Sequence, residues 1–369
     1  MVRSSPHIIR LFLTYASGTL LFGSGLCADF SADWAKMKRI QPKGYVCYRA
    51  AEPIRVDGKL DELSWQKVPW SEPFVDIEGD AKPLPPLRTR VKMLWDDLYF
   101  YFAAELEEPN LRGTLTNRDS VIFHDNDFEI FIDPNGDSHE YYEFEMNALN
   151  TVWDLLLKKP YKDGGPAINE WDIAGLKTAV QVRGTLNDPS DKDQGWTLEV
   201  AFPWKALAEY AQRPTPPRDG EQWRVDFSRV EWRLEIEEGK YKRTEGVKEN
   251  NWVWSPTGII DMHRPEKWGY VQFSTGPVTK VKYKPDPAAP ARDLLQEIYY
   301  AERDYHEKHG RFGASLSELG LAHVRWSRLA DTPKIQITVD GFWASAEIKL
   351  REKQTQRWHI RQDAKVWTE

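Results

Sequence analysis

The chain has 369 residues, 41% of them hydrophobic and 29% charged, which is the composition of an ordinary globular protein with room for one large and one small domain. A formal net charge of −7 excludes the basic surface that nucleic-acid binding requires. No segment after residue 28 is apolar over the length of a membrane-spanning helix, so an integral membrane protein is not expected. The 17 Trp residues suit strands and buried cores, and they also offer flat faces on which sugar rings can stack.

The first 28 residues have the pattern of a secretory signal peptide. Two arginines flank the start of a largely apolar stretch, 11–26, which leads into small residues. We therefore expect residues 1–28 to be a signal peptide and the protein to be exported, to the periplasm, the medium or the cell surface. Leu26 stands directly before Cys27, where a lipid-attachment motif has a small residue, so the sequence disfavours a lipid anchor at Cys27. Cleavage of the signal peptide just after Cys27 or Ala28 leaves Cys47 as the only cysteine, which excludes an internal disulfide.

The next part of the chain has the pattern of many short strands. Alternating apolar runs bounded by turn residues predict strands at 90–94, 98–106, 128–132, 140–147, 152–157, 176–182, 195–203, 223–232 and 269–273. Short helices are expected from Leu60 to Trp65 and, after the break at Pro203, at 204–211. Many strands at short spacing with few long helices indicate a mainly β fold, an antiparallel β-sandwich over residues 45–275.

The composition changes at Gly276, where prolines within 276–292 predict a semi-rigid linker. A helix is expected at 293–308, because apolar residues recur there at the helical period. A further short helix and three strands are expected at 315–319, 335–339, 342–350 and 357–361. Residues 293–369 are therefore predicted to form a small α+β appendage, whose partner the sequence does not identify. A helix that leads through Gly310-Arg311-Phe312 into a short sheet resembles the globular head of pilin-like proteins.

The strand predicted at 128–132 has two different faces. Phe128, Ile130 and Ile132 share one face, whereas Glu129 and Phe131 share the other. A solvated face is the ordinary explanation for an outward carboxylate. A carboxylate beside an aromatic ring also suits sugar binding. The carboxylate accepts hydrogen bonds from sugar hydroxyl groups, and the aromatic side chain stacks on the sugar ring.

Five segments in fixed order carry a family resemblance. They are Val56-Asp57-Gly58 with Trp65, the hairpin turn Trp95–Tyr99, the strand Asp127–Asp133, Tyr142-Glu143-Phe144 with Asn147, and Pro265–Gly269. Together they resemble the family 9 carbohydrate-binding modules over residues 45–275. The resemblance implies a non-catalytic β-sandwich that binds oligo- or polysaccharide, is commonly attached to xylan-degrading enzymes and holds structural calcium.

The resemblance also assigns candidate site residues. In the family two Trp side chains clamp a sugar ring, and the matching positions here are Phe123 and Met262. The family's hydroxyl-accepting Glu corresponds to Glu129 and its neighbouring Asn to Asn147. Glu145 stands where the family has an Arg, so the sugar site is expected to match the family only in part.

Two tryptophans close to Met262 offer a replacement for the clamp. Trp252 and Trp254 lie beside Asn250 and Asn251, and Asn with Trp combines hydrogen bonding with stacking. The alternative is that both tryptophans are core residues, and the sequence leaves the two interpretations open. The same alternatives hold for Trp171 as a rim residue.

The turn after strand 128–132 is a candidate calcium loop. Asp133, Asn135 and Asp137 place oxygen ligands at alternate positions, as at the start of such a loop. An Asx-rich turn without metal explains the same pattern. The predicted function requires no cofactor, and structural calcium is the one metal that the resemblance suggests.

Two other function classes stay open. Haem-binding sandwich domains are related in pattern to the family, and Met146 or Met262, with His263 or a lysine, would then be axial ligands. This haem reading is the less favoured one, because Met is more often packing filler. The other function class is a structural or interaction protein that has lost its sugar site. No pair of carboxylates and no nucleophile motif indicates a catalytic centre, so a non-catalytic accessory to xylan or glucan breakdown is the preferred interpretation.

Overall fold

The computed structural model describes residues 29–325, 328–351 and 354–369. The predicted signal peptide and Cys27 lie outside the described residues. Cys47 is buried and unpaired, and burial raises the pKa of its thiol. Among the described helices, none has the length and apolarity of a membrane span.

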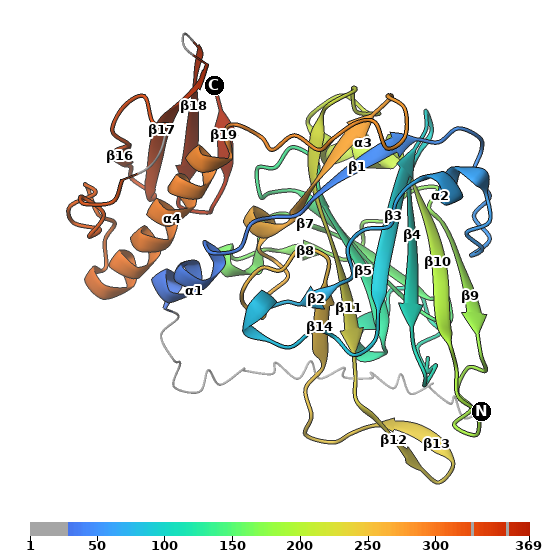
Figure 1. Ribbon diagram of the computed structural model, residues 1–369. Coiled ribbons are helices and arrows are strands. Elements are labelled where there is room, and N and C mark those ends of the chain that lie inside the picture. Colours follow the sequence, from blue (N-terminus) through green and yellow to red (C-terminus); the bar gives the residue numbers. More distant parts are fainter. Residues whose placement is uncertain (1–28, 326–327, 352–353) are drawn as a thin grey trace, which may run out of the picture.

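One curled sheet forms the main body of the molecule (Figure 1). Its strands follow the order β8 (Ala167–Ile168), β7 (Val152–Leu157), β6 (Tyr141–Asn147), β5 (Asp127–Asp133), β11 (Gln222–Glu231), β15 (Gly269–Ser274), β1 (Gly44–Arg49), β3 (Thr89–Trp95), β4 (Tyr99–Glu107), β10 (Gly195–Pro203) and β9 (Lys177–Arg183). A side branch adds β14 (Asn250–Val253), paired with β11, and β2 (Val75–Asp76). Strand β1 is parallel to both of its neighbours, whereas the other pairs are antiparallel.

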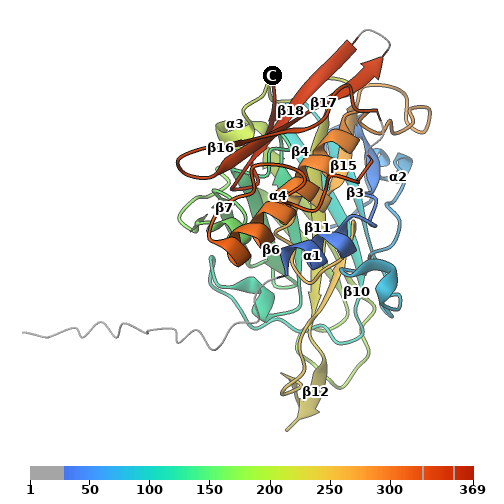
Figure 2. The same ribbon diagram turned by 90° about the vertical axis from the view of Figure 1, so that its left-hand side faces the viewer.

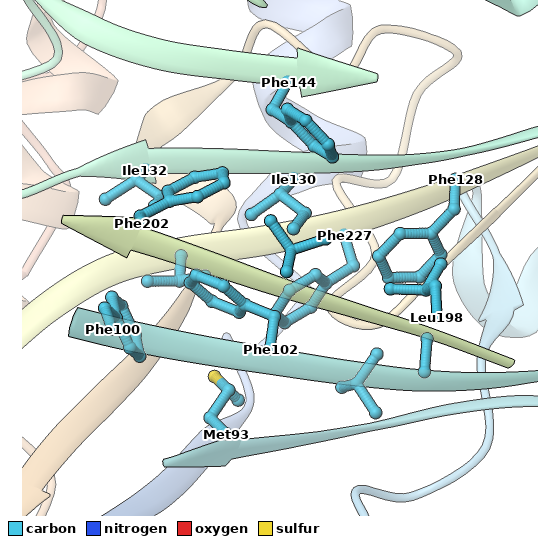
Figure 3. Packing of buried hydrophobic residues seen from close by; sticks show 14 of the residues in the cluster. Met93, Phe100, Phe102, Phe128, Ile130, Ile132, Phe144, Leu198, Phe202 and Phe227 are labelled. Carbon is cyan, nitrogen blue, oxygen red and sulfur yellow. The ribbon is translucent and has the colours of Figure 1, made fainter. Parts of the chain in front are cut away.

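The two halves of this sheet face each other across the main core, as in a sandwich. Figure 3 shows side chains of β5 and β11 interleaved with those of β4 and β10. Phe102 of β4 packs against Phe202 and Phe227, with ring centroids 5.3 and 5.7 Å apart. Because alternate residues of a strand point to opposite faces, Phe128, Ile130 and Ile132 enter this core together. The predicted mainly β fold is confirmed, with parallel β1 joining the two antiparallel halves.

Four helices and a second, smaller sheet complete the described structure. The helices are α1 (Phe30–Met37), α2 (Leu63–Lys67), α3 (Trp204–Ala211) and α4 (Ala289–His309). The small sheet has the order β16 (Lys334–Ile337), β17 (Phe342–Arg351), β18 (Gln354–Arg361) and β19 (Val366–Thr368), and a separate hairpin joins β12 (Leu234–Glu237) to β13 (Lys240–Arg243). Short 3₁₀ turns lie at η1 (Gly79–Ala81), η2 (Ile122–His124), η3 (Tyr161–Asp163) and η4 (Pro265–Lys267).

The C-terminal part differs from its prediction at the start of α4, at residues 315–319 and in the additional strand β19. Helix α4 begins at Ala289, four residues earlier than expected, because Pro290 occupies the first turn, where its missing N–H is no loss. The helix expected at 315–319 is a turn. The segment predicted as a linker lies along β1, where the ring of Tyr283 packs directly on Gly44 and Tyr48 donates a hydrogen bond to the carbonyl of Val281.

Helix α1 was not predicted, and it packs on α4 from the opposite end of the chain. Figures 1 and 2 both show the two helices side by side. Trp34 stacks on Tyr300 with ring centroids 5.3 Å apart. The backbone N–H groups of Phe30 and Ser31 donate to the carboxylate of Asp304, which satisfies the first turn of α1. The N-terminal and C-terminal segments therefore share one hydrophobic cluster beside the main sheet.

Candidate functional site

A pocket of about 420 Å³ lies on the face of β5 and β6 that points away from the main core. Glu129 and Phe131 of β5 reach it, as the alternation along the strand predicted. Glu143 and Glu145 come from the same face of β6, and Glu145 stands directly opposite Glu129 in the ladder. The site is therefore built on two neighbouring strands of the rigid sheet.

Exposed aromatic side chains line the same pocket. Phe123, on the 3₁₀ turn η2, is 37% exposed, and Tyr161, on η3, is 52% exposed. Trp153 of β7 is half-buried in the wall. The backbone N–H of Phe123 donates to Oε2 of Glu145 at 3.0 Å, so the buried carboxylate holds the loop that carries the aromatic ring.

The charged side chains of the pocket are all acidic. Five carboxylates line it, from Glu129, Glu143, Glu145, Glu249 and Asp261, and no Lys or Arg is among the described residues of the lining. The nearby imidazole of His263 is neutral at physiological pH, because burial lowers its pKa to about 4. Its Nδ1 shares a 2.9 Å hydrogen bond with the hydroxyl of Tyr141. The electrostatics disfavour an anionic ligand.

The strand carboxylates lie deep in the fold. Glu129 is 6% exposed, and burial raises its pKa to about 7. Burial first, and the negative charge of Glu129 next, hold the pKa values of Asp127, Glu143 and Glu145 well above the ordinary range. The charges of Glu143 and Glu145, together with burial, also raise the pKa of Tyr161 to about 12. Glu129 therefore lies beneath the pocket and not on a solvated face.

The C-terminal appendage holds the loop that carries Tyr161. Asp163, two residues further along, accepts hydrogen bonds from Tyr299 at 2.5 Å and from Arg303 at 2.8 Å, both on α4. Tyr300 of the same helix donates to Glu266 at 2.5 Å. The appendage is thus fixed against the sandwich by buried polar contacts, next to the pocket.

Four of the predicted site residues meet at this pocket: Phe123, Glu129, Glu145 and Met262. Met262 is only 8% exposed and packs with Phe131 and Trp268. Its backbone carbonyl accepts the indole N–H of Trp268 at 2.7 Å. Met262 therefore forms part of the pocket wall and offers no open face for stacking.

Trp252 and Trp254 lie in the main core and do not line the pocket. They are therefore core residues and do not replace the aromatic clamp. They are 4% and 2% exposed. A Cβ atom added at Gly269 would meet the ring of Trp254 at 2.3 Å, which shows that this indole fills the space beside β15. Trp171 packs on Tyr142, with ring centroids 5.0 Å apart, and does not line the pocket either.

Asn147 is fully buried, and its amide is used inside the protein. Its Nδ2 donates to the carbonyl of Leu115 and to Asp125, at 2.9 and 3.1 Å. Its Oδ1 accepts the backbone N–H groups of Leu149 and Thr151. Asn147 therefore shapes the turn after β6 and has no free group for a ligand.

The predicted calcium loop is an Asx turn whose oxygens are occupied. The two carboxylate oxygens of Asp133 accept the backbone N–H groups of Gly136 and Ser138. Asn135 and Asp137 each cap the backbone two residues ahead, and Asp137 also forms a 3.1 Å ion pair with Lys365. Their oxygens already serve amides and an ammonium group, so the Asx turn explains this pattern without a metal.

Of the residues named for haem ligation, Met262 and His263 both line the pocket, whereas Met146 does not. Met146 is fully buried in the main core, on the face of β6 opposite the pocket. His263 lies at the pocket, and its Nδ1 is engaged by Tyr141. The described geometry therefore does not fit axial ligation by Met146 with His263.

Sequence reasoning missed several residues of the pocket. Tyr161 follows a proline in a Gly- and Pro-rich loop, and an aromatic residue in such a loop was the available signal. Glu143, which lines the pocket, and Asp127, which lies beside it, stand two residues from Glu145 and Glu129, so the alternation of each strand placed them on the same face. Only the pairing of β5 with β6 reveals that these carboxylates form one cluster.

Comparison with known proteins finds relatives for the part of the chain that contains β5 and β6. The family described as "Carbohydrate family 9 binding domain-like" matches residues 56–218. Curated relatives include exoglucanase XynX of Acetivibrio thermocellus, 27% identical over 153 residues, and endo-1,4-beta-xylanase A of Thermotoga maritima, 28% identical over 173 residues. These matches cover 41% and 44% of this chain, and only 12% of either relative.

Solved structures with some likeness include a family 9 carbohydrate-binding module from Caldicellulosiruptor kristjanssonii in complex with cellotriose, at 16% identity and a TM-score of 0.43. Another is a putative carbohydrate-binding protein from Bacteroides uniformis, at 16% identity and a TM-score of 0.47. They cover 66% and 63% of this chain and the whole of each matched chain. Residues 56–218 of this chain, a little under half of its length, therefore match the carbohydrate family 9 binding domain-like family.

Proposed function

We propose that this chain is an exported, non-catalytic protein that binds oligo- or polysaccharide in the pocket on β5 and β6. The observation that carries the proposal is the pairing of exposed Phe123 and Tyr161 with the buried acceptors Glu129 and Glu145 in one cavity. An aromatic face packs on the C–H face of a sugar, and carboxylates accept hydrogen bonds from hydroxyl groups. The pocket size suits one or two sugar rings.

A neutral polysaccharide is the ligand class that we infer. The described lining has five carboxyl groups and no Lys or Arg, so it offers uronic acids and phosphorylated sugars no counter-charge. The curated relatives are an exoglucanase and xylanases, which supports glucan or xylan as the polymer. Because this chain spans about an eighth of those enzymes, their catalytic activity is not part of the proposal.

The carboxylate geometry supports binding over hydrolysis. A glycosidase places two carboxyl groups on either side of the scissile bond. Here Glu129 and Glu145 are cross-strand neighbours, 6% and 1% exposed, so a glycosidic bond does not fit between them. Incubation with xylan and glucan should release no reducing sugar above a buffer control.

The proposal is tested by isothermal titration of neutral xylo- and gluco-oligosaccharides into the purified chain. Phe123→Ala should weaken binding about tenfold, which corresponds to the loss of one stacking contact of about 1.4 kcal/mol. Phe123→Trp should retain or tighten binding. Trp367→Ala is the matched control, because Trp367 lines a separate hollow on the C-terminal sheet. Equal affinities of Phe123→Ala and wild type would refute this site.

The appendage has a supporting role in this proposal, since it fixes the loop of Tyr161. Arg303→Ala removes the 2.8 Å bond to Asp163 and should weaken oligosaccharide binding about threefold, through mobility of the loop. Arg357→Ala, in an exposed ion pair with Glu347 on the same appendage, should leave binding unchanged.

Export is tested separately from binding. The chain fused to a reporter at its C-terminus should leave the cytoplasm of a bacterial host, and deletion of residues 2–28 should retain it there. Retention of the full-length fusion in the cytoplasm would contradict export without affecting the proposed binding site.

A further inference from the structure

Three buried carboxylates meet beside the pocket, and two of them, Glu129 and Glu145, line it. Asp127, Glu129 and Glu145 each offer one oxygen, and these oxygens lie within 4.8 Å of one another. Two oxygens on opposite sides of a calcium ion lie about 4.8 Å apart, because each calcium–oxygen bond is about 2.4 Å long. The spacing of this acidic trio therefore suits a single cation held between the three side chains.

No basic side chain neutralises the acidic trio. Within the described ranges, no nitrogen of Lys, Arg or His lies within 4.0 Å of a carboxylate oxygen of Asp127, Glu129 or Glu145. Their exposures are 0, 6 and 1%. Since uncompensated charge is costly in the interior, a set of protons or a cation must balance these groups.

A fourth buried carboxylate, close to this trio in the sheet, also has an unsatisfied oxygen. Glu143 is 5% exposed and lies two residues before Glu145, on the same face of β6. It lines the pocket, and its Oε2 has no hydrogen-bond partner among the described residues. Oδ2 of Asp127 is also buried without a partner in the described structure. Buried acceptors are normally satisfied, so orphaned oxygens at one place indicate a missing donor or cation.

We propose that Asp127, Glu129 and Glu145 bind one divalent cation, calcium by its chemistry. The ligand atoms are all carboxylate oxygens, which suit a hard cation and not zinc or copper, which prefer nitrogen and sulfur. Calcium takes six to eight oxygens, so positions stay open toward the pocket. If the proposed glycan function holds, sugar hydroxyls complete the coordination there; the cation site itself does not depend on that function.

The first test measures the cation without any sugar. Protein dialysed against a chelator at pH 8 is titrated calorimetrically with CaCl₂, and its thermal unfolding is followed with and without the salt. One calcium per chain should bind, and Tm should rise by about 3–5 °C at a hundredfold excess over Kd. Glu145→Gln and Asp127→Asn should abolish both responses. Asp172→Asn, in the other acidic cluster, should keep them.

The fold of the variants is checked in the chelator. Glu145→Gln should unfold there at or above the temperature of the wild type, because an amide needs no counter-charge. Wild-type protein that shows neither calcium heat nor a Tm shift overturns the proposal, and the carboxylates then share protons. A calcium response that Glu145→Gln retains in full also overturns it.

The second test separates this inference from the proposed function. Oligosaccharide affinity is measured in chelator and in calcium. Calcium binding with tighter sugar binding supports both proposals, and calcium binding without any sugar binding supports the cation site while rejecting the glycan function. Sugar binding with no calcium binding rejects the cation site and leaves the glycan function standing.

Discussion

Two acidic clusters of this protein differ in how their charge is balanced. Asp119, Asp154 and Asp172 surround the guanidinium of Arg118, whose Nη2 contacts Asp154 and lies 2.7 Å from Asp172. The trio Asp127, Glu129 and Glu145 has no such side chain in the described structure.

The difference between the clusters is informative because the cluster with the built-in Arg is the more exposed of the two. Asp119 and Asp172 are exposed, so water alone could solvate them. The cluster that most needs a counter-charge is the buried one, and it lacks a built-in cation. We infer that an Arg side chain balances carboxylates whose role is structural. Where a ligand completes the site, the space between the carboxylates is left open for it.

The largest effect should come from removing the cation of the Arg118 cluster. Arg118→Met leaves Asp154, which is fully buried, with the backbone N–H of Ile173 as its one remaining donor among the described residues. The free energy of unfolding should fall by about 2–3 kcal/mol, as measured in urea. A loss below about 0.5 kcal/mol would show that this cluster, too, needs no fixed counter-charge.

The pH dependence should come next in size. In cation-free buffer, Glu129 has a folded pKa of about 7, above its ordinary value of 4.5, so the folded state binds its proton more tightly than the unfolded state. The resulting stability is fully present below pH 4.5 and is lost as the pH rises through 7. Wild type should therefore lose about 2 kcal/mol relative to Glu129→Gln between pH 4.5 and 8. Parallel curves for the two proteins would contradict this account of the acidic trio.

The same acid-to-amide change should have opposite signs in the two clusters. At pH 8 in chelator, Glu145→Gln should stabilise the protein by about 1 kcal/mol, since it removes an unbalanced buried charge. Asp154→Asn should destabilise it by about 1 kcal/mol, since it breaks the ion pair with Arg118. Chemical denaturation of both variants in one buffer makes the comparison, and equal signs would remove the distinction.

The smallest effect should come from Asp172→Asn. The Asp172 side chain is 63% exposed, and solvent screens its pair with Arg118. The change in unfolding free energy should stay within about 0.5 kcal/mol. A larger loss would mean that Arg118 is held mainly by Asp172 and not by buried Asp154.

Much of the architecture followed from local pattern. The strand 195–203 and the helix 204–211 were predicted with the bounds that the structure shows, because strict alternation ends at Pro203 and a helical period starts there. The shared face of Glu129 and Phe131 followed from the same alternation. These features depend only on residues close in sequence.

The parts that failed depend on distant contacts. The depth of Glu129 was missed, because Tyr161 and Met262, far along the chain, cover that face of β5. Trp252 and Trp254 could not be assigned until β14 was placed beside β11. Helix α1 escaped notice because its apolar side is completed by α4, at the other end of the chain. The periodicity of a sequence predicts which residues share one face of a strand or helix. It does not predict which distant segment packs against that face.

A crystal structure of the chain grown with calcium and a neutral xylo- or gluco-oligosaccharide tests the central claim most directly. The account predicts a sugar ring against Phe123 and Tyr161, above a cation held by Asp127, Glu129 and Glu145. A sugar bound elsewhere, for instance in the hollow at Trp343 and Trp367 of the C-terminal sheet, or an acidic trio that holds only protons beneath an empty pocket, would contradict it.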